Sequence, residues 1–141
     1  MLFRSLDLSD VDAIKINPEE GQNIVSGSHD EMMLALQKKG IEYVLLTNKV
    51  DVSLLVKNRV YSLRLPNKTT HDTTGIGDIF CSTFTCTMLK EKDFLWALCF
   101  AAGSAQAALE SNNVGLQKIP KKGMVENNAS YFYNLVDFRD L

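Results

Sequence analysis

The stretch HDTTGIGDIF, residues 71–80, decides how this chain is interpreted. Two glycines come just before Asp78, and an apolar run with helical character follows. A Gly-x-Gly-Asp turn that opens a helix presents backbone N–H groups at the positive end of the helix dipole, where anions bind. Glycine also permits a close approach of the backbone to the anion and a positive φ. A carboxylate at Asp78 is suited to act as the base for a hydroxyl that attacks phosphorus.

The same residues are also compatible with an ordinary helix start. Thr73 or Thr74 would then be the N-cap, the glycines would form the turn, and Asp78 would be a first-turn acid that suits the dipole. A Gly-x-Gly pair is a weak signal, so its spacing alone leaves both interpretations open.

The longer pattern D-T-T-G-x-G-D-x-F at residues 72–80 resembles the C-terminal signature of the PfkB/ribokinase-like carbohydrate kinases, which usually reads D-T-T-G-A-G-D-x-F. Only Ile76 departs from it. The resemblance implies a phosphoryl transferase in which the backbone of Gly75, Ile76 and Gly77 forms an anion hole and Asp78 is the catalytic base. Ile76 keeps its N–H, but its side chain needs room beside the phosphates.

A second motif of that family, N-x-x-E, matches Asn17 to Glu20. The resemblance links Asn17 and Glu20 to magnesium and phosphate binding. The same four residues also make a good helix start, with Asn as N-cap, Pro at the first helical position and Glu at the third. We expect both roles, with Glu20 acting through water because Mg²⁺ keeps part of its hydration shell.

The third motif of the family, T-x-G-x-x-G, is only partly present. Thr47 matches, and both glycines are replaced, the first by Lys49 and the second by Val52. The resemblance assigns Thr47 and Lys49 to nucleotide binding. Lys49 either pairs with a phosphate in place of the lost glycine contact or is a solvated lysine at a strand end.

Two further assignments rest on the resemblance. Asp72 and Thr74 match positions that in some relatives help to hold a monovalent cation, K⁺, although a loop Asp can instead bind nearby amides. Ala102, with Ala101 and Ser104, falls where the family lines an adenine pocket. Small residues at helical spacing are equally typical of close helix packing.

Composition excludes several classes of protein. A chain of 141 residues with 45% hydrophobic residues and a net charge of −2 can bury a modest core and offers no basic field for nucleic acid or a membrane surface. Its three cysteines fit small buried apolar residues in a reducing compartment. The N-terminus lacks the apolar core of a signal peptide, so we expect a cytoplasmic protein. The apolar run 94–109 contains polar residues, so we expect it to be an internal helix.

Strand and helix patterns alternate along the chain, which predicts an α/β fold. With the resemblance, we expect the C-terminal part of a ribokinase-like, mainly parallel sheet flanked by helices, in one domain over residues 1–141. The expected strands are 11–16, 42–47, and a hairpin of 52–56 and 60–65; the expected helices begin at Asn17 and Ser28 and continue with 75–89, 93–110 and 125–136.

The resemblance covers only the C-terminal half of such a kinase. It implies ATP-dependent phosphoryl transfer to a hydroxyl of a sugar or nucleoside, with Mg²⁺ required. A vitamin kinase of the same broad fold stays open, although the signature favours the sugar and nucleoside branch. We also expect self-association or association with a missing N-terminal half. The alternative is a non-catalytic nucleotide-binding or self-associating module.

Overall fold

The computed structural model describes residues 8–49, 51–66, 75–111 and 115–141. The chain divides into two compact units. Unit 1 comprises residues 1–64 with the C-terminal segment 137–141, and unit 2 comprises residues 65–136. We describe each unit by itself, and the expectation of one domain over the whole chain stays a prediction.

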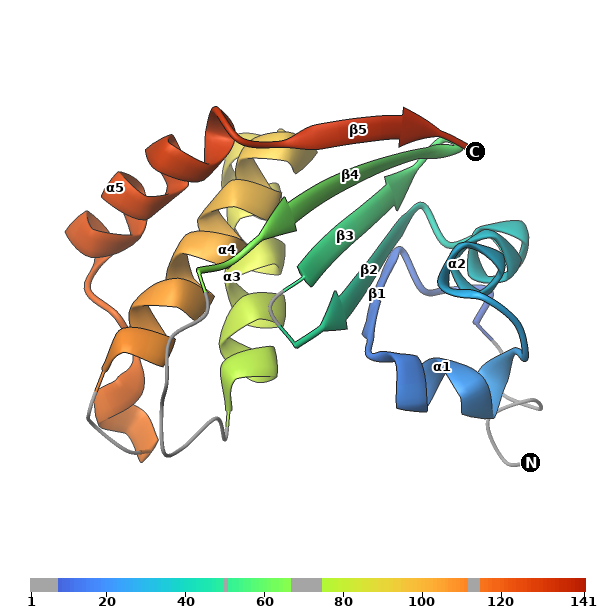
Figure 1. Ribbon diagram of the computed structural model, residues 1–141, viewed down its shortest axis with the longest axis horizontal. Coiled ribbons are helices and arrows are strands. Elements are labelled where there is room, and N and C mark those ends of the chain that lie inside the picture. Colours follow the sequence, from blue (N-terminus) through green and yellow to red (C-terminus); the bar gives the residue numbers. More distant parts are fainter. Residues whose placement is uncertain (1–7, 50, 67–74, 112–114) are drawn as a thin grey trace. The chain divides into compact units, whose positions relative to one another are not determined.

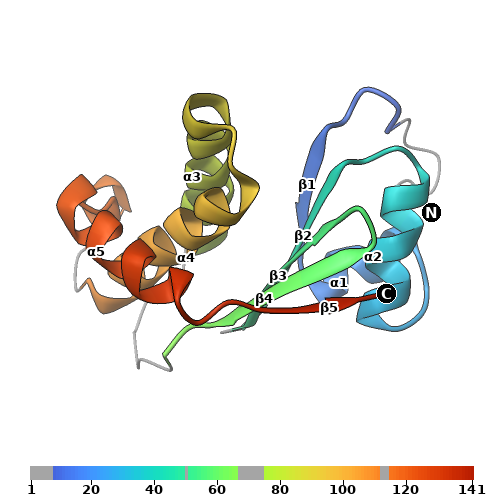
Figure 2. The same cartoon turned by 90° about the horizontal axis from the view of Figure 1, so that it is seen from above.

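Unit 1 is built on a sheet of five strands in the order β1-β2-β3-β4-β5 (Figure 1). The strands are β1 (Ala13–Ile16), β2 (Tyr43–Asn48), β3 (Asp51–Val56), β4 (Arg59–Arg64) and β5 (Asp137–Asp140). Helices α1 (Pro18–Ile24) and α2 (His29–Lys38) lie on the same face of this sheet (Figure 2). The α/β class predicted from the sequence is therefore confirmed.

The direction of the strands corrects one expectation, because the sheet is mixed rather than mainly parallel. Only β1 and β2 pair in parallel, and the β2–β3, β3–β4 and β4–β5 pairs are antiparallel. The short loop between β3 and β4 explains the direction of that pair. It has two residues, Lys57 and Asn58, with φ of 48° and 65°. A two-residue loop joins only antiparallel strands. The predicted hairpin of residues 52–65 is confirmed.

Strand β5 was not predicted. Its residues, Asp137-Phe138-Arg139-Asp140, are all exposed and lack the alternation of apolar and polar side chains that indicates a strand. Its side chains make ion pairs, and the ring of Phe138 lies 6.4 Å from that of Tyr61. Arg139 forms a bidentate ion pair with Asp30 of α2, and Arg59 of β4 pairs with Asp140.

The core of unit 1 lies between the sheet and its two helices. It consists of buried apolar side chains from the sheet, from α2 and from the connection between α2 and β2, namely Ile16, Met33, Leu36, Ile41, Val44, Leu46, Leu55 and Val60. Ser28 caps α2, and Gly40 follows its end with φ of 100°. Glycine adopts this left-handed conformation without steric cost, which is why the helix stops where the sequence predicts.

Unit 2 is helical. It contains α3 (Ile76–Glu91), α4 (Phe94–Glu110), the 3₁₀ helix η2 (Gly115–Lys118) and α5 (Lys122–Tyr133). The central α4 packs against both α3 and α5. Asp93 caps α4 as the sequence predicts, through hydrogen bonds from the N–H groups of Leu95 and Trp96. Helix α5 begins and ends a few residues earlier than the predicted 125–136.

Small residues on α4 allow α5 to approach closely. The side-chain amide of Asn128 donates to the carbonyl of Gly103 at 3.1 Å.

The three cysteines differ from one another: Cys99 is buried as expected, Cys81 is half-buried and Cys86 is exposed. The expectation that Cys86 is buried was wrong, because α3 packs against α4 through its opposite side.

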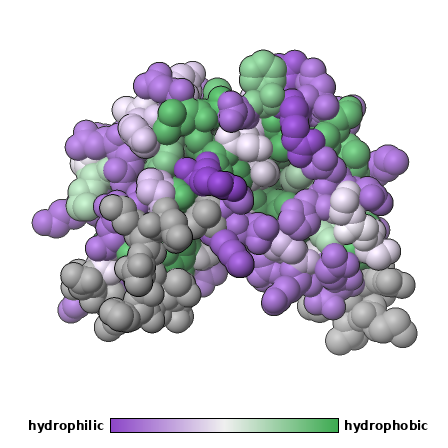
Figure 3. Space-filling view, viewed as in Figure 1, coloured by the Kyte–Doolittle hydropathy of each residue, from purple (hydrophilic) through white to green (hydrophobic). Residues whose placement is uncertain are grey.

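No helix in the described part of the chain is long and apolar enough to cross a membrane. The visible surface of both units mixes hydrophilic residues with smaller apolar areas (Figure 3).

Candidate functional site

The N-terminus of α3 has the geometry of an open anion site. Gly75 is the N-cap residue with φ of 85°, and its carbonyl accepts the first helical hydrogen bond from Ile79 N–H at 2.9 Å. In the described part of the chain no side chain caps this end. The N–H groups of Ile76, Gly77 and Asp78 precede that first helical bond, and no acceptor among the residues that the structure describes engages them.

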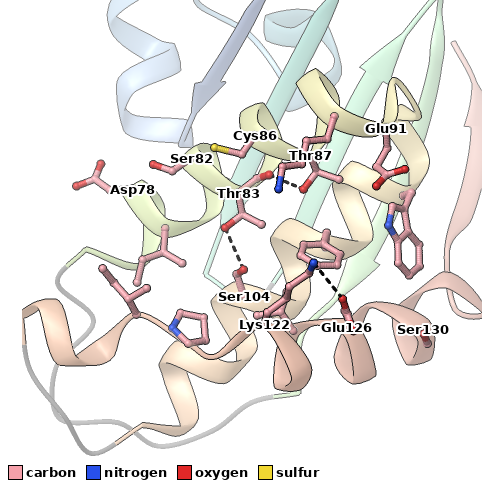
Figure 4. Close-up of a pocket in the computed structure, with 17 residues that line it drawn as sticks. Asp78, Ser82, Thr83, Cys86, Thr87, Glu91, Ser104, Lys122, Glu126 and Ser130 are labelled. Atoms are coloured by element: carbon pink, nitrogen blue, oxygen red, sulfur yellow. Dashed lines mark hydrogen bonds and ion pairs between the residues drawn. The ribbon is translucent and has the colours of Figure 1, made fainter.

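The carboxylate of Asp78 projects from the first turn of α3 and is exposed (Figure 4). It is on the same helix end as the three N–H groups, so one short segment carries both the predicted anion hole and the predicted base. Asp72 and Thr74, which the resemblance assigns to a monovalent cation, lie outside the described residues. So do the two alternative cap residues, Thr73 and Thr74.

In unit 1, Asn17 and Glu20 form a reciprocal capping box at the start of α1. Asn17 Oδ1 accepts from Glu20 N–H at 2.8 Å, and Glu20 Oε2 accepts from Asn17 N–H at 2.9 Å. The predicted capping role is therefore confirmed. This bond engages one carboxylate oxygen of Glu20, so the other can still accept from a water bound to Mg²⁺, and the donor set fits that ion.

No group of three His, Cys, Asp or Glu side chains that could hold a metal occurs among the residues the structure describes. A magnesium ion here would therefore keep most of its own waters. This agrees with the reluctance of Mg²⁺ to lose its hydration shell.

Thr47 lies beside Asn17 at one edge of the sheet. Strands β1 and β2 run parallel with Ile16 opposite Leu46, so their carboxyl ends lie at the same end of the sheet. Thr47 Oγ1 donates to the carbonyl of Ile16 at 3.5 Å. Parallel pairing of β1 with β2 thus places Asn17 and Thr47 at the carboxyl ends of two neighbouring strands of unit 1.

Lys49 adopts a left-handed backbone conformation, with φ of 55°, in the turn after β2. The family has glycine at this position, and this φ is one that glycine favours. The turn therefore keeps a glycine-like backbone while carrying a positive side chain. Val52, at the second replaced glycine, is buried in β3.

Helices α3, α4 and α5 enclose a groove of about 770 Å³. Its floor includes Trp96, Phe100 and Ser104, and Thr83 Oγ1 donates to Ser104 Oγ at 3.0 Å (Figure 4). Ala102 is fully buried and does not line this groove. Sequence reasoning missed the groove because its α4 residues recur every four positions, which is also typical of a packed helix.

Residues 5–122 match the pfkB family carbohydrate kinase domain. The chain belongs to this family. A search of curated protein sequences gave no match.

Solved structures share the ribokinase-like fold. A ribokinase from Thermotoga maritima has a TM-score of 0.73 at 20% identity, with 84% of this chain and 42% of that chain covered. The Arabidopsis thaliana ribokinase complexed with ribose and ATP has 0.73 at 21%, with 86% and 42% covered. A putative ribokinase II from E. coli in complex with ATP and Mg²⁺ has 0.75 at 17%, with 88% and 41% covered. The chain thus spans about two fifths of the length of these structures.

Proposed function

We propose that this pfkB-family chain carries the phosphate-binding and catalytic part of a carbohydrate kinase that transfers the γ-phosphoryl group of ATP to a hydroxyl of a sugar or nucleoside. The observation that carries the proposal is the start of α3. There, Gly75 is left-handed, the N–H groups of residues 76–78 have no acceptor within the described part of the chain, and the Asp78 side chain belongs to the same turn. Because the chain belongs to the pfkB family, we interpret this arrangement as a phosphate site with a base beside it.

In this proposal the chain works mostly by positioning and charge stabilisation. The N–H groups of Ile76, Gly77 and Asp78 stabilise charge on the phosphoryl group as it moves. The Asp78 carboxylate accepts the proton of the attacking hydroxyl. Because the anion contacts come from the backbone, an Ile side chain in place of the usual Ala leaves them in place.

The residues of unit 1 are assigned to the donor and its metal. Thr47 and Lys49 would contact the nucleotide, with the Lys49 ammonium replacing a glycine contact. Glu20 and Asn17 would hold Mg²⁺ through its waters, and the ion would neutralise phosphate charge. Asp72 and Thr74 as K⁺ ligands and Ala102 beside the adenine stay predictions, as does a cytoplasmic location.

The nature of the donor is part of the proposal. Two of the matched structures contain ATP, one of them with ribose, and this supports ATP. Another matched protein is a pyrophosphate-dependent kinase in the ribokinase family, complexed with a pyrophosphate analog and myo-inositol. Pyrophosphate and myo-inositol therefore belong in the same assay as ATP and ribose.

The test compares wild type with Asp78→Asn. Phosphoryl transfer from labelled ATP or pyrophosphate to ribose or myo-inositol is measured with Mg²⁺, and donor affinity is measured by calorimetry. General-base catalysis contributes roughly 10²–10⁴-fold, so the variant should lose that much rate while its donor Kd changes little. A variant with wild-type turnover would refute the assignment of Asp78.

A non-catalytic module is the second candidate, because the chain spans about two fifths of the matched kinases and lacks both glycines of the third motif. Donor binding without transfer by the wild-type chain would favour it. Transfer by this chain, or by this chain after addition of a complementing half, would exclude it.

A further inference from the structure

We propose that Lys118 supplies a built-in positive charge at the end of unit 2 where α3 starts, in place of the monovalent cation that the family resemblance implies. The inference rests on the proposed phosphoryl transfer and adds a positioning residue to it. The observation behind it is a buried charged side chain that the proposed catalysis leaves without a role. Asp78 and the N–H groups at the start of α3 keep their access to substrate.

Lys118 is the last residue of the 3₁₀ helix η2, and only 2% of its surface is exposed. Within the described part of the chain it is the one buried side chain that carries a charge. The same short segment leaves Leu116 85% exposed and Ile119 60% exposed. Hydrophobic burial alone would favour the reverse arrangement, and lysine is almost never buried unless its ammonium is paired. The segment is therefore arranged to hold the Lys118 ammonium inside unit 2.

Lys118 lies at the end of unit 2 where α3 starts. Helices α3 and α4 are joined by only two residues, so they run antiparallel, and Thr83 Oγ1 donates to Ser104 Oγ between them. At a rise of about 1.5 Å per residue, the start of α3 lies about 10 Å along the helix from that bond, and the end of α4 lies about 9 Å from it. Segment η2 follows the end of α4, at the same end of the unit (Figure 1), and Ile119, directly after Lys118, lines the groove together with Asp78.

A positive charge at this end offsets the negative charge that the reaction gathers there. Asp78 at the start of α3 and Glu110 at the end of α4 are both exposed carboxylates. A bound phosphoryl group would add further negative charge, whereas the N–H groups of α3 carry only partial positive charges. A full charge buried in the same end of the unit acts partly through protein, where attraction is screened less than in water. Lys118 would thus act on the phosphoryl group by its charge, without contacting the substrate.

This lysine does not fit a K⁺ ion at the same end of unit 2. An ammonium and K⁺ carry the same charge, and two such charges repel strongly where little water separates them. The K⁺ ligands that the resemblance implies, Asp72 and Thr74, lie outside the described residues. We therefore expect the wild-type chain to need no monovalent cation, because it carries one of its own.

The first test asks whether a free cation can replace the ammonium. Lys118→Ala removes it, and thermal unfolding is followed without any donor in KCl, NH₄Cl and choline chloride at equal ionic strength. K⁺ or NH₄⁺ at about 200 mM should raise the Tm of the variant by at least about 3 °C over choline, because an ion bound to the folded state stabilises it. Wild type should respond to the three salts by less than about 1 °C, and so should Lys121→Ala, which loses an exposed lysine nearby.

Each outcome of this salt comparison decides the proposal. A Lys118→Ala chain that folds only in KCl or NH₄Cl, as judged by circular dichroism, would show the same replacement more strongly. Equal responses of wild type and Lys118→Ala to the three salts would overturn the proposal. So would a variant that folds in none of them, since a cation of matching charge would then not substitute for the side chain.

The second test separates the charge of Lys118 from the volume of its stem. Lys118→Met keeps most of the stem and loses the charge. Calorimetry with ATP and with pyrophosphate in the presence of Mg²⁺ should give this variant a donor affinity at least about tenfold below that of wild type, and Lys121→Ala should bind as wild type does. Equal affinity in Lys118→Met and wild type would leave the lysine as a packed stem and would overturn the proposal. If wild type binds neither donor, the proposed function fails, and the salt comparison still decides the role of Lys118.

Discussion

Asn17 and Glu20 each satisfy the backbone N–H of the other, at 2.8 and 2.9 Å. The pair therefore has a structural task in addition to the magnesium role that the family motif suggests. The two tasks use different properties of Glu20, since the cap needs an acceptor oxygen and the metal needs a negative charge. This difference allows them to be separated by mutation.

Glu20→Gln should keep the cap and lose the charge. We expect its free energy of unfolding to stay within about 0.5 kcal/mol of wild type, while Mg²⁺-dependent donor binding weakens several-fold. Glu20→Ala should lose both and cost about 0.5–2 kcal/mol. Urea unfolding and calorimetry at several Mg²⁺ concentrations measure the two effects. Unchanged Mg²⁺ dependence in Glu20→Gln would leave Glu20 as a helix cap only.

Lys49→Gly separates backbone conformation from charge in the turn after β2. A lysine at φ of 55° is strained relative to glycine, so the change should leave stability equal or raise it by up to about 1 kcal/mol. Loss of the ammonium should weaken donor binding by about tenfold. Lys57→Gly is the matched control, since Lys57 has φ of 48° in the β3–β4 turn. Equal donor affinity in both variants would mean that Lys49 is solvated.

Gly103→Ala should open the contact between α4 and α5. A Cβ there would lie 2.9 Å from the carbonyl oxygen of Val125 and 3.1 Å from Ala129 N, both of them backbone atoms. We expect a loss of about 1–3 kcal/mol in thermal or urea unfolding. Gly123→Ala, where a Cβ meets nothing within 4 Å, should be neutral or slightly stabilising. Similar stabilities for the two variants would contradict the close packing.

Acid should loosen strand β5 before the rest of unit 1. The hydrogen bond from Arg139 holds the pKa of Asp30 below its ordinary value of 3.8. The stabilisation is therefore complete above that value and is lost as the pH falls through the lowered pKa. Both side chains are partly exposed, so it amounts to less than about 1 kcal/mol. The protection factors of the β5 amides against hydrogen exchange should fall more between pH 5 and pH 3 in wild type than in Asp30→Asn.

The sequence predicts most helices of this fold because their ends are chemically marked. Asn17, Ser28 and Asp93 cap the helices that follow them, and Gly40 ends α2. Strand directions were less predictable, because an apolar run such as 43–48 has no signal for the direction of its neighbour. Strand β5 carries no alternating hydrophobic pattern, because it is held by backbone pairing with β4, by the contact of Phe138 with Tyr61, and by ion pairs with residues more than 80 positions away.

The candidate site was predictable where a motif fixes it. Gly75, Asp78, Asn17 and Glu20 stand at helix starts, as their motifs indicate, and parallel pairing of β1 with β2 brings Thr47 beside Asn17. The left-handed turn at Lys49 was not predictable, because lysine rarely adopts a positive φ.

Calorimetric titration of the folded chain with ATP and with pyrophosphate, with and without Mg²⁺, tests the central claim most directly. The account predicts saturable, Mg²⁺-dependent binding of at least one donor, with little change in Asp78→Asn and a clear loss in Gly75→Ala, because alanine is strained at the φ of 85° that opens the start of α3. Absence of binding by a chain shown to be folded would contradict it and would leave the signature as the start of a helix.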